Sequence, residues 1–159
     1  MEEELLREKI INLATYHKGK SYEHGMHGPL SFDCAGFVWY VYDELLHINL
    51  YKDGYGRSTT TMMMTSNYGK ITLFDENILN KDLSLIRQGD ILFFHRQSLK
   101  EKEPSHNNKY PGHCGIYLGN NKFIHCTKKN NVHVTDLEED EYWQKKLVAS
   151  KDVISNYYK

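Results

Sequence analysis

The sequence lacks several features that would place it at once in a functional class. No apolar run approaches the roughly 20 residues that a membrane-spanning helix needs. The 20 basic and 21 acidic side chains leave a formal net charge of −1, so nothing indicates a surface for nucleic acid. The start, Met1-Glu2-Glu3-Glu4, has no signal-peptide pattern, and we expect a cytoplasmic location for the chain as written.

Cysteine is also scarce. The three cysteines, Cys34, Cys114 and Cys126, are odd in number and far apart, which excludes a disulfide framework. The 159 residues are enough to bury a core without disulfides or metals, and they predict a single domain over residues 1–159.

What is present is an ordered change from helical to strand patterns. Apolar residues at helical spacing predict an amphipathic helix from Glu2 to about His17 and a second, largely apolar helix from Cys34 to about His47. The later half predicts four strands, over residues 91–95, 113–118, 122–126 and 132–137, followed by a tail that forms a final strand or helix over an edge. Helices first and strands afterwards predict an α+β domain on an antiparallel sheet.

The chemistry points to the start of the second helix. Asp33 suits a helix N-cap, which places Cys34 in the first turn, where the helix dipole favours thiolate over thiol. Ala35 and Gly36 are small enough to let another segment approach closely. A lone cysteine in an apolar run is more often a small buried hydrophobic residue, so a nucleophile requires a base nearby.

Two histidines could supply that base and the group that orients it. A three-residue loop at Gly119-Asn120-Asn121 pairs Gly115 with His125, which leaves His113 and His125 as diagonal neighbours on one face of the sheet. A two-residue turn at Asn120-Asn121 pairs Ile116 with His125 instead, and the two rings then face opposite sides. A Cys34-His113-His125 triad therefore demands the first register.

The remaining histidines and cysteines leave alternatives open. His95 could line the same cleft, since histidine is the side chain most often used in proton transfer. We expect no role for the others: His24, His27, His47, His106 and His133. A zinc site would draw on Cys114, Cys126, His113, His125 and His133. The sequence has no Cys-x-x-Cys or His-x-x-x-His pair, and the favoured register turns both cysteines away from the two catalytic histidines, so we expect no metal or other cofactor.

Three blocks then resemble the NlpC/P60 cysteine peptidases in order and spacing, and together they cover about residues 16–137. The first runs from Lys18-Gly19-Lys20-Ser21-Tyr22 through Phe32-Asp33-Cys34-Ala35-Gly36-Phe37-Val38. The second is Gln88-Gly89-Asp90-Ile91-Leu92-Phe93-Phe94, and the third covers residues 112–125, from Gly112-His113-Cys114-Gly115 to Phe123-Ile124-His125. The resemblance implies a papain-like core in which the nucleophile helix packs on the sheet. It also implies hydrolysis of peptidoglycan stem peptides, commonly at the bond from γ-D-glutamate to a diamino acid.

By position, the resemblance makes Cys34 the nucleophile, His113 the base and His125 the orienting residue. Tyr22 matches a tyrosine that lines the family's cleft, and Asp33 matches its acidic residue before the nucleophile.

The sequence departs from the family pattern in three ways. Ala35 stands where the family usually has serine, which removes a hydroxyl near the S2 side of the site. The loop from Arg96 to Gly112 is long, as lids or insertions beside a site often are. Without a signal peptide, the protein would act inside the cell, or be phage-associated or released to the wall by a non-classical route. An amidase, a deamidase, an acyltransferase of the same superfamily and a catalytically silent binding module remain alternatives.

Overall fold

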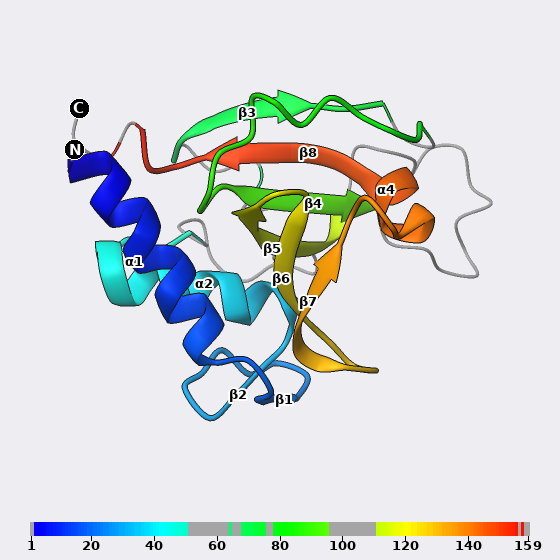
Figure 1. Cartoon of the computed structure of the whole chain (residues 1–159). Helices are drawn as coiled ribbons and strands as arrows, with labels where there is room; N and C mark the ends of the chain where they lie inside the picture. Colours follow the sequence, from blue (N-terminus) through cyan, green and yellow to red (C-terminus); the bar gives the residue numbers. More distant parts are fainter. Residues whose placement is uncertain are drawn as a thin grey trace.

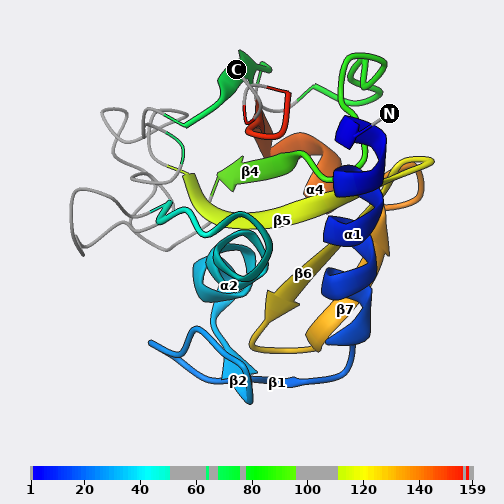
Figure 2. The same ribbon diagram turned by 90° about the vertical axis from the view of Figure 1, so that its left-hand side faces the viewer.

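The computed structural model describes residues 2–50, 64, 68–75, 78–95, 111–155 and 157. Two helices, α1 (Glu2–Tyr16) and α2 (Cys34–Leu46), pack against a six-stranded antiparallel sheet (Figures 1 and 2). The predicted α+β fold is therefore confirmed, and both helices lie within one residue of their predicted bounds. Among the described residues, no helix combines the length and apolar character that crossing a membrane requires.

The sheet has the strand order β3-β8-β4-β5-β6-β7. Its strands are β3 (Lys70–Leu73), β4 (Ile91–His95), β5 (Pro111–Gly119), β6 (Lys122–Thr127), β7 (Asn131–Asp136) and β8 (Leu147–Asp152). The four predicted strands correspond to β4, β5, β6 and β7. The tail does form a helix, α4 (Glu141–Lys146), and a strand, but β8 lies inside the sheet between β3 and β4 instead of covering an edge (Figure 1).

The strands alternate between two apolar layers, as a sheet covered on both faces requires. Ile91 and Phe93 of β4 face the helices and belong to the same buried apolar cluster as Val38 of α2. Phe94, from the opposite face, packs with Trp143 of α4, so α4 covers the side of the sheet away from α1 and α2. A short parallel pair, β1 (Ser21–Tyr22) and β2 (Ser31–Phe32), leads into α2.

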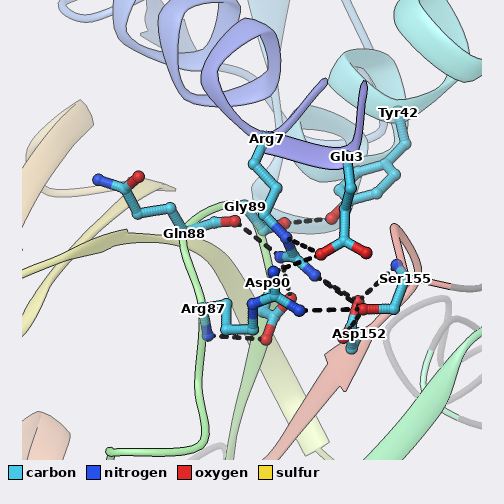
Figure 3. A network of polar contacts seen from close by, with 9 residues as sticks. All are labelled: Glu3, Arg7, Tyr42, Arg87, Gln88, Gly89, Asp90, Asp152 and Ser155. Atoms are coloured by element: carbon cyan, nitrogen blue, oxygen red, sulfur yellow. Dashed lines mark hydrogen bonds and ion pairs between the residues drawn. The ribbon is translucent and has the colours of Figure 1, made fainter. Parts of the chain in front are cut away.

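A buried arginine joins α1 to the sheet. The Arg7 guanidinium donates to Asp90 at 2.8 Å, to Asp152 at 2.9 Å and to the Gln88 carbonyl oxygen at 2.8 Å (Figure 3). Glu3 also pairs with Arg7, and the Tyr42 hydroxyl of α2 donates to the Gly89 carbonyl oxygen beside them. One guanidinium thus connects the first helix, the turn before β4 and the end of β8.

The apolar face predicted for the first helix is confirmed. Its buried members are Leu6, Ile10, Ala14 and, just past the end of α1, His17, while Leu13 is half-buried against the same core. Arg7 is equally buried, but the apolar pattern does not predict its burial. That burial depends on partners far along the chain. The long loop predicted from Arg96 to Gly112 lies largely outside the described residues, because residues 96–110 are not among them. Its last two residues, Pro111 and Gly112, begin β5.

Candidate active site

Cys34 occupies the first turn of α2, and Asp33 caps this helix as predicted. Asp33 has an extended backbone with φ −92°, and its Oδ1 accepts the Gly36 N–H at 2.6 Å. Its Oδ2 accepts the Gly25 N–H at 3.1 Å, so the same carboxylate also fixes the preceding loop. Burial, the largest influence, raises the pKa of Asp33, and the two backbone hydrogen bonds oppose that shift.

The small residues after Cys34 make room for that loop. A Cβ on Gly36 would collide with the Met26 carbonyl oxygen and would stand 2.9 Å from the Cα of His27. The predicted close approach is therefore confirmed at Gly36. Ala35 is itself buried, with 2% of its surface exposed, so the position that departs from the serine pattern points into packed structure.

The surroundings of Cys34 favour its thiolate. A hydrogen bond from the Cys114 side chain is the largest influence that holds the pKa of Cys34 well below its usual value. A hydrogen bond and positive charge from His113 and the Ala35 backbone N–H act in the same direction, while burial opposes them. The Cys114 sulfur also lies 3.6 Å from the Cys34 carbonyl oxygen. One S–H proton serves one acceptor at a time, and a charged thiolate is the better acceptor of the two.

The register between β5 and β6 is the one that the triad demands, although the loop is not the predicted one. Ile116 pairs with Ile124 and Tyr117 with Phe123, which puts Gly115 opposite His125. Only Asn120 and Asn121 form the turn, both with positive φ, and Gly119 pairs with Lys122. The three-residue loop was therefore wrong. A bulge between Tyr117 and Gly119 shifts the pairing by one residue, and that shift restores the shared face.

The two histidines consequently meet. His113 Nε2 lies 2.7 Å from His125 Nδ1, so the remaining nitrogen of His113, Nδ1, is left for Cys34. A Cβ on Gly115 would lie 3.0 Å from the His125 Cβ, which confirms that glycine leaves room for the ring. His125 is fully buried, and burial, reinforced by the charges of His113 and His133, holds its pKa well below the usual value. His125 is therefore a neutral imidazole at neutral pH.

Comparison with known proteins agrees with this geometry. The model of the NlpC/P60 family matches residues 19–152. The chain belongs to the NlpC/P60 family. The resemblance seen in the three sequence blocks is thus confirmed, and it extends over most of the chain.

This NlpC/P60 chain is similar to several longer proteins. It is 29% identical to the murein DD-endopeptidase MepH of Escherichia coli K12, over 86% of this chain and 42% of that protein. It is 32% identical to the gamma-DL-glutamyl hydrolase of Bacillus subtilis 168, over 89% of this chain and 27% of that protein. The structure of NlpC2 from Trichomonas vaginalis superposes with a TM-score of 0.66 at 26% identity, covering 93% of this chain and 46% of that one. The chain thus spans about half or less of these relatives.

Two further rings lie beside the histidines, of which Trp143 was not singled out from the sequence and His133 was. The Trp143 ring lies 4.8 Å from the His113 ring and 5.1 Å from that of His125, and it covers both from α4. His133, for which no role was expected, pairs with His125 across β6 and β7, with ring centroids 4.3 Å apart. The alternation of residues 132–137 could have indicated that pairing. Nothing in the sequence around Trp143 indicates where its ring lies.

The structure also describes the other predicted positions. Tyr22 pairs with Phe32 in the short β1–β2 ladder, and its backbone N–H donates to the Asn131 side chain at 3.1 Å. Its side chain is half-buried and packs against the helix-side core, and its strand partner Phe32 precedes Cys34 by two residues. His95 ends β4 opposite Pro111. Within the described ranges, no group of three or more His, Cys, Asp or Glu side chains has an arrangement that could hold a metal ion.

Proposed function

We propose that this NlpC/P60 chain is a cysteine endopeptidase that cleaves peptidoglycan stem peptides at the bond from γ-D-glutamate to a diamino acid. The observation that carries the proposal is the linked set Cys34, His113 and His125. A helix-terminal sulfur with a lowered pKa faces a histidine, whose far nitrogen lies 2.7 Å from a second, buried histidine. That is the arrangement a thiol nucleophile, its base and an orienting group require.

The acylation step follows from these positions. The Cys34 thiolate attacks the carbonyl carbon of the scissile amide, and the electron pair of the carbonyl moves to its oxygen. Backbone N–H groups at the start of α2 stabilise that oxyanion in this mechanism, since a helix N-terminus favours negative charge. When the C–N bond breaks, His113 Nδ1 gives its proton to the leaving amine, and a thioester to Cys34 remains.

Deacylation reverses the role of His113. The neutral ring takes a proton from water as the water oxygen attacks the thioester carbon, and the C–S bond breaks to restore the thiolate. His125 keeps the ring of His113 in place through both steps. Asp33 contributes by capping α2, because both of its oxygens already accept backbone N–H groups.

The relatives support two different bonds. The name of the Bacillus subtilis relative, gamma-DL-glutamyl hydrolase, favours the γ-glutamyl bond, whereas the MepH name describes a DD-endopeptidase. We favour the γ-glutamyl bond because it is also the bond that the sequence blocks imply. Cleavage at the DD crosslink is the second candidate, and one experiment separates the two.

The experiment is mass spectrometry of purified muropeptides incubated with the wild type, with Cys34→Ala and with Cys126→Ala as a matched buried-cysteine control. We expect fragments ending in γ-D-glutamate with the wild type and the control, and none with Cys34→Ala. Fragments cut at the DD crosslink would replace the favoured bond by the second candidate. Cleavage that survives in Cys34→Ala would exclude Cys34 as the nucleophile.

A folded wild type that cuts neither bond would overturn the murein proposal. Iodoacetamide labelling of the same sample then separates the alternatives. Rapid modification of Cys34 would indicate an active thiol whose acyl substrate is different, as in an amidase, a deamidase or an acyltransferase. Slow modification would indicate a catalytically silent binding module.

A further inference from the structure

The hydrogen-bonded line from His113 continues beyond His125. His125 Nε2 lies 2.8 Å from the Thr135 hydroxyl oxygen on β7. His125 pairs with His133 and Phe123 with Thr135, so Thr135 is the diagonal neighbour of His125 on the same face of the sheet. His113, His125 and Thr135 thus form one line across β5, β6 and β7.

The tautomer of His125 decides whether this line supports catalysis. A neutral imidazole has one N–H donor and one lone-pair acceptor. When His113 carries two protons beside a thiolate, its Nε2–H must donate, so Nδ1 of His125 must accept. The proton of His125 then sits on Nε2, inside a fully buried ring, where it needs an acceptor of its own.

We propose that Thr135 is a positioning residue whose hydroxyl oxygen accepts the His125 Nε2–H and so holds the tautomer that receives the His113 proton donor. This inference rests on the proposed function, in which His113 serves Cys34. Thr135 is only half-buried, so its own hydroxyl proton can donate to water while the oxygen accepts from His125. The residue at position 135 therefore does not have to be a carboxylate. Its oxygen has to accept the N–H of a neutral His125 ring and does not have to stabilise a positive charge.

The opposite tautomer of His125 would not support the thiolate. With its proton on Nδ1, His125 would donate to His113 Nε2 at the same 2.7 Å contact. His113 could then hold a single proton, on Nδ1, and the thiolate would lose its imidazolium partner. Without a hydroxyl at position 135, the tautomer that receives the His113 proton carries a buried Nε2–H with no acceptor, and this raises the free energy of the imidazolium–thiolate pair.

The test compares Thr135→Val, which keeps the branched shape but has no acceptor, with Thr135→Ser, which keeps the hydroxyl. We expect Thr135→Val to move the pH profile of Cys34 alkylation to higher pH and to lower kcat on muropeptides about 10-fold, with KM unchanged. Thr135→Ser should keep both near the wild type. Nitrogen-15 NMR of His125 should report Nε2–H in the wild type and in Thr135→Ser, and Nδ1–H in Thr135→Val.

Several outcomes would overturn the inference. One is that Thr135→Val leaves both the pH profile of Cys34 alkylation and the His125 tautomer unchanged. Another is that Thr135→Ser loses as much kcat as Thr135→Val. A third is that Thr135→Val changes KM alone. If Thr135→Val does not fold, an Nδ1–H signal for His125 in the wild type overturns it, and an Nε2–H signal together with normal Thr135→Ser kinetics supports it. Alkylation and NMR need no substrate, so a wild type that is inactive on muropeptides defeats the proposed function while the role of Thr135 is still decided.

Discussion

The thiol sulfur of Cys114 lies 3.6 Å from the backbone carbonyl oxygen of Cys34, so a second sulfur atom stands beside the candidate nucleophile. Cys114 directly follows His113 on β5, but it faces the helices while His113 faces the other side of the sheet. Consecutive residues of one strand therefore approach Cys34 from two directions. His113 supplies a charge and a proton, and Cys114 supplies an S–H group that can donate to the thiolate.

Replacing Cys114 by alanine should make Cys34 less acidic. The Cys114 hydrogen bond is the largest influence that lowers the pKa of Cys34, so its removal should raise that pKa. One lost hydrogen bond of about 1 kcal/mol corresponds to roughly fivefold slower alkylation of Cys34 at mildly acidic pH. Cys126→Ala is the matched control, because that thiol donates instead to the Phe32 carbonyl oxygen at 3.3 Å. An unchanged profile in Cys114→Ala would contradict the prediction.

The wild type should react with iodoacetamide at a single cysteine. The pKa of Cys34 is held well below its usual value, whereas burial raises the pKa of Cys126 to about 12. Cys114 and Cys126 are also fully buried, while Cys34 is partly exposed. At about pH 6 we therefore expect one label per native chain, on Cys34, as read by peptide mapping. Modification of Cys126 at a comparable rate would contradict this expectation.

Arg7→Met should destabilise the fold far more than Arg87→Met. The Arg7 side chain is 5% exposed and pairs with the nearly buried Asp90, so its loss leaves a buried carboxylate uncompensated. Breaking a buried pair from one side costs about 3–5 kcal/mol, as measured by denaturant unfolding. The Arg87 side chain is 49% exposed, and the loss of its pair with Glu3 should cost at most about 1 kcal/mol. Equal losses would show that the Arg7 network contributes little.

The destabilisation in Arg7→Met should grow as pH rises. Burial raises the pKa of Asp90 to about 6, although Arg7 and the Arg87 backbone N–H oppose the shift. With the folded pKa above the unfolded one, the stability from this group is fully present below about pH 4 and is lost as pH rises through 6. Without Arg7 the charged carboxylate has lost its main partner, so the deficit should be smallest near pH 4 and largest near neutrality. Unfolding curves of both proteins across that range, under identical salt, test the trend, and a deficit that shrinks with pH would contradict it.

The parts of the site that the sequence predicted depend on local chemistry. The cap at Asp33 and the start of α2 follow from residues within one helical turn. The register of His113 and His125 was predicted from the demand that the two rings share a face, and the structure satisfies it.

The parts that the sequence did not predict depend on contacts between distant segments or on small irregularities. The bulge near Leu118 shifts the pairing by one residue after a two-residue turn, and no residue type there required it. Arg7 is buried because Asp90 and Asp152, far along the chain, converge on it. Trp143 reaches the histidines only because β8 returns to the middle of the sheet and places α4 over them.

The central position of β8 has a consequence for the order in which the chain folds. The strands β4 to β7 are neighbours in the sheet in the order of synthesis, so they can pair as soon as they leave the ribosome. β3 is made before them but has its sheet neighbour in β8, which appears only after residue 146. Until then β4 presents an open edge, and the salt-bridge partner of Arg7 at Asp152 is missing. The strands that carry the histidine line are therefore all synthesised before β8, the strand that completes the sheet.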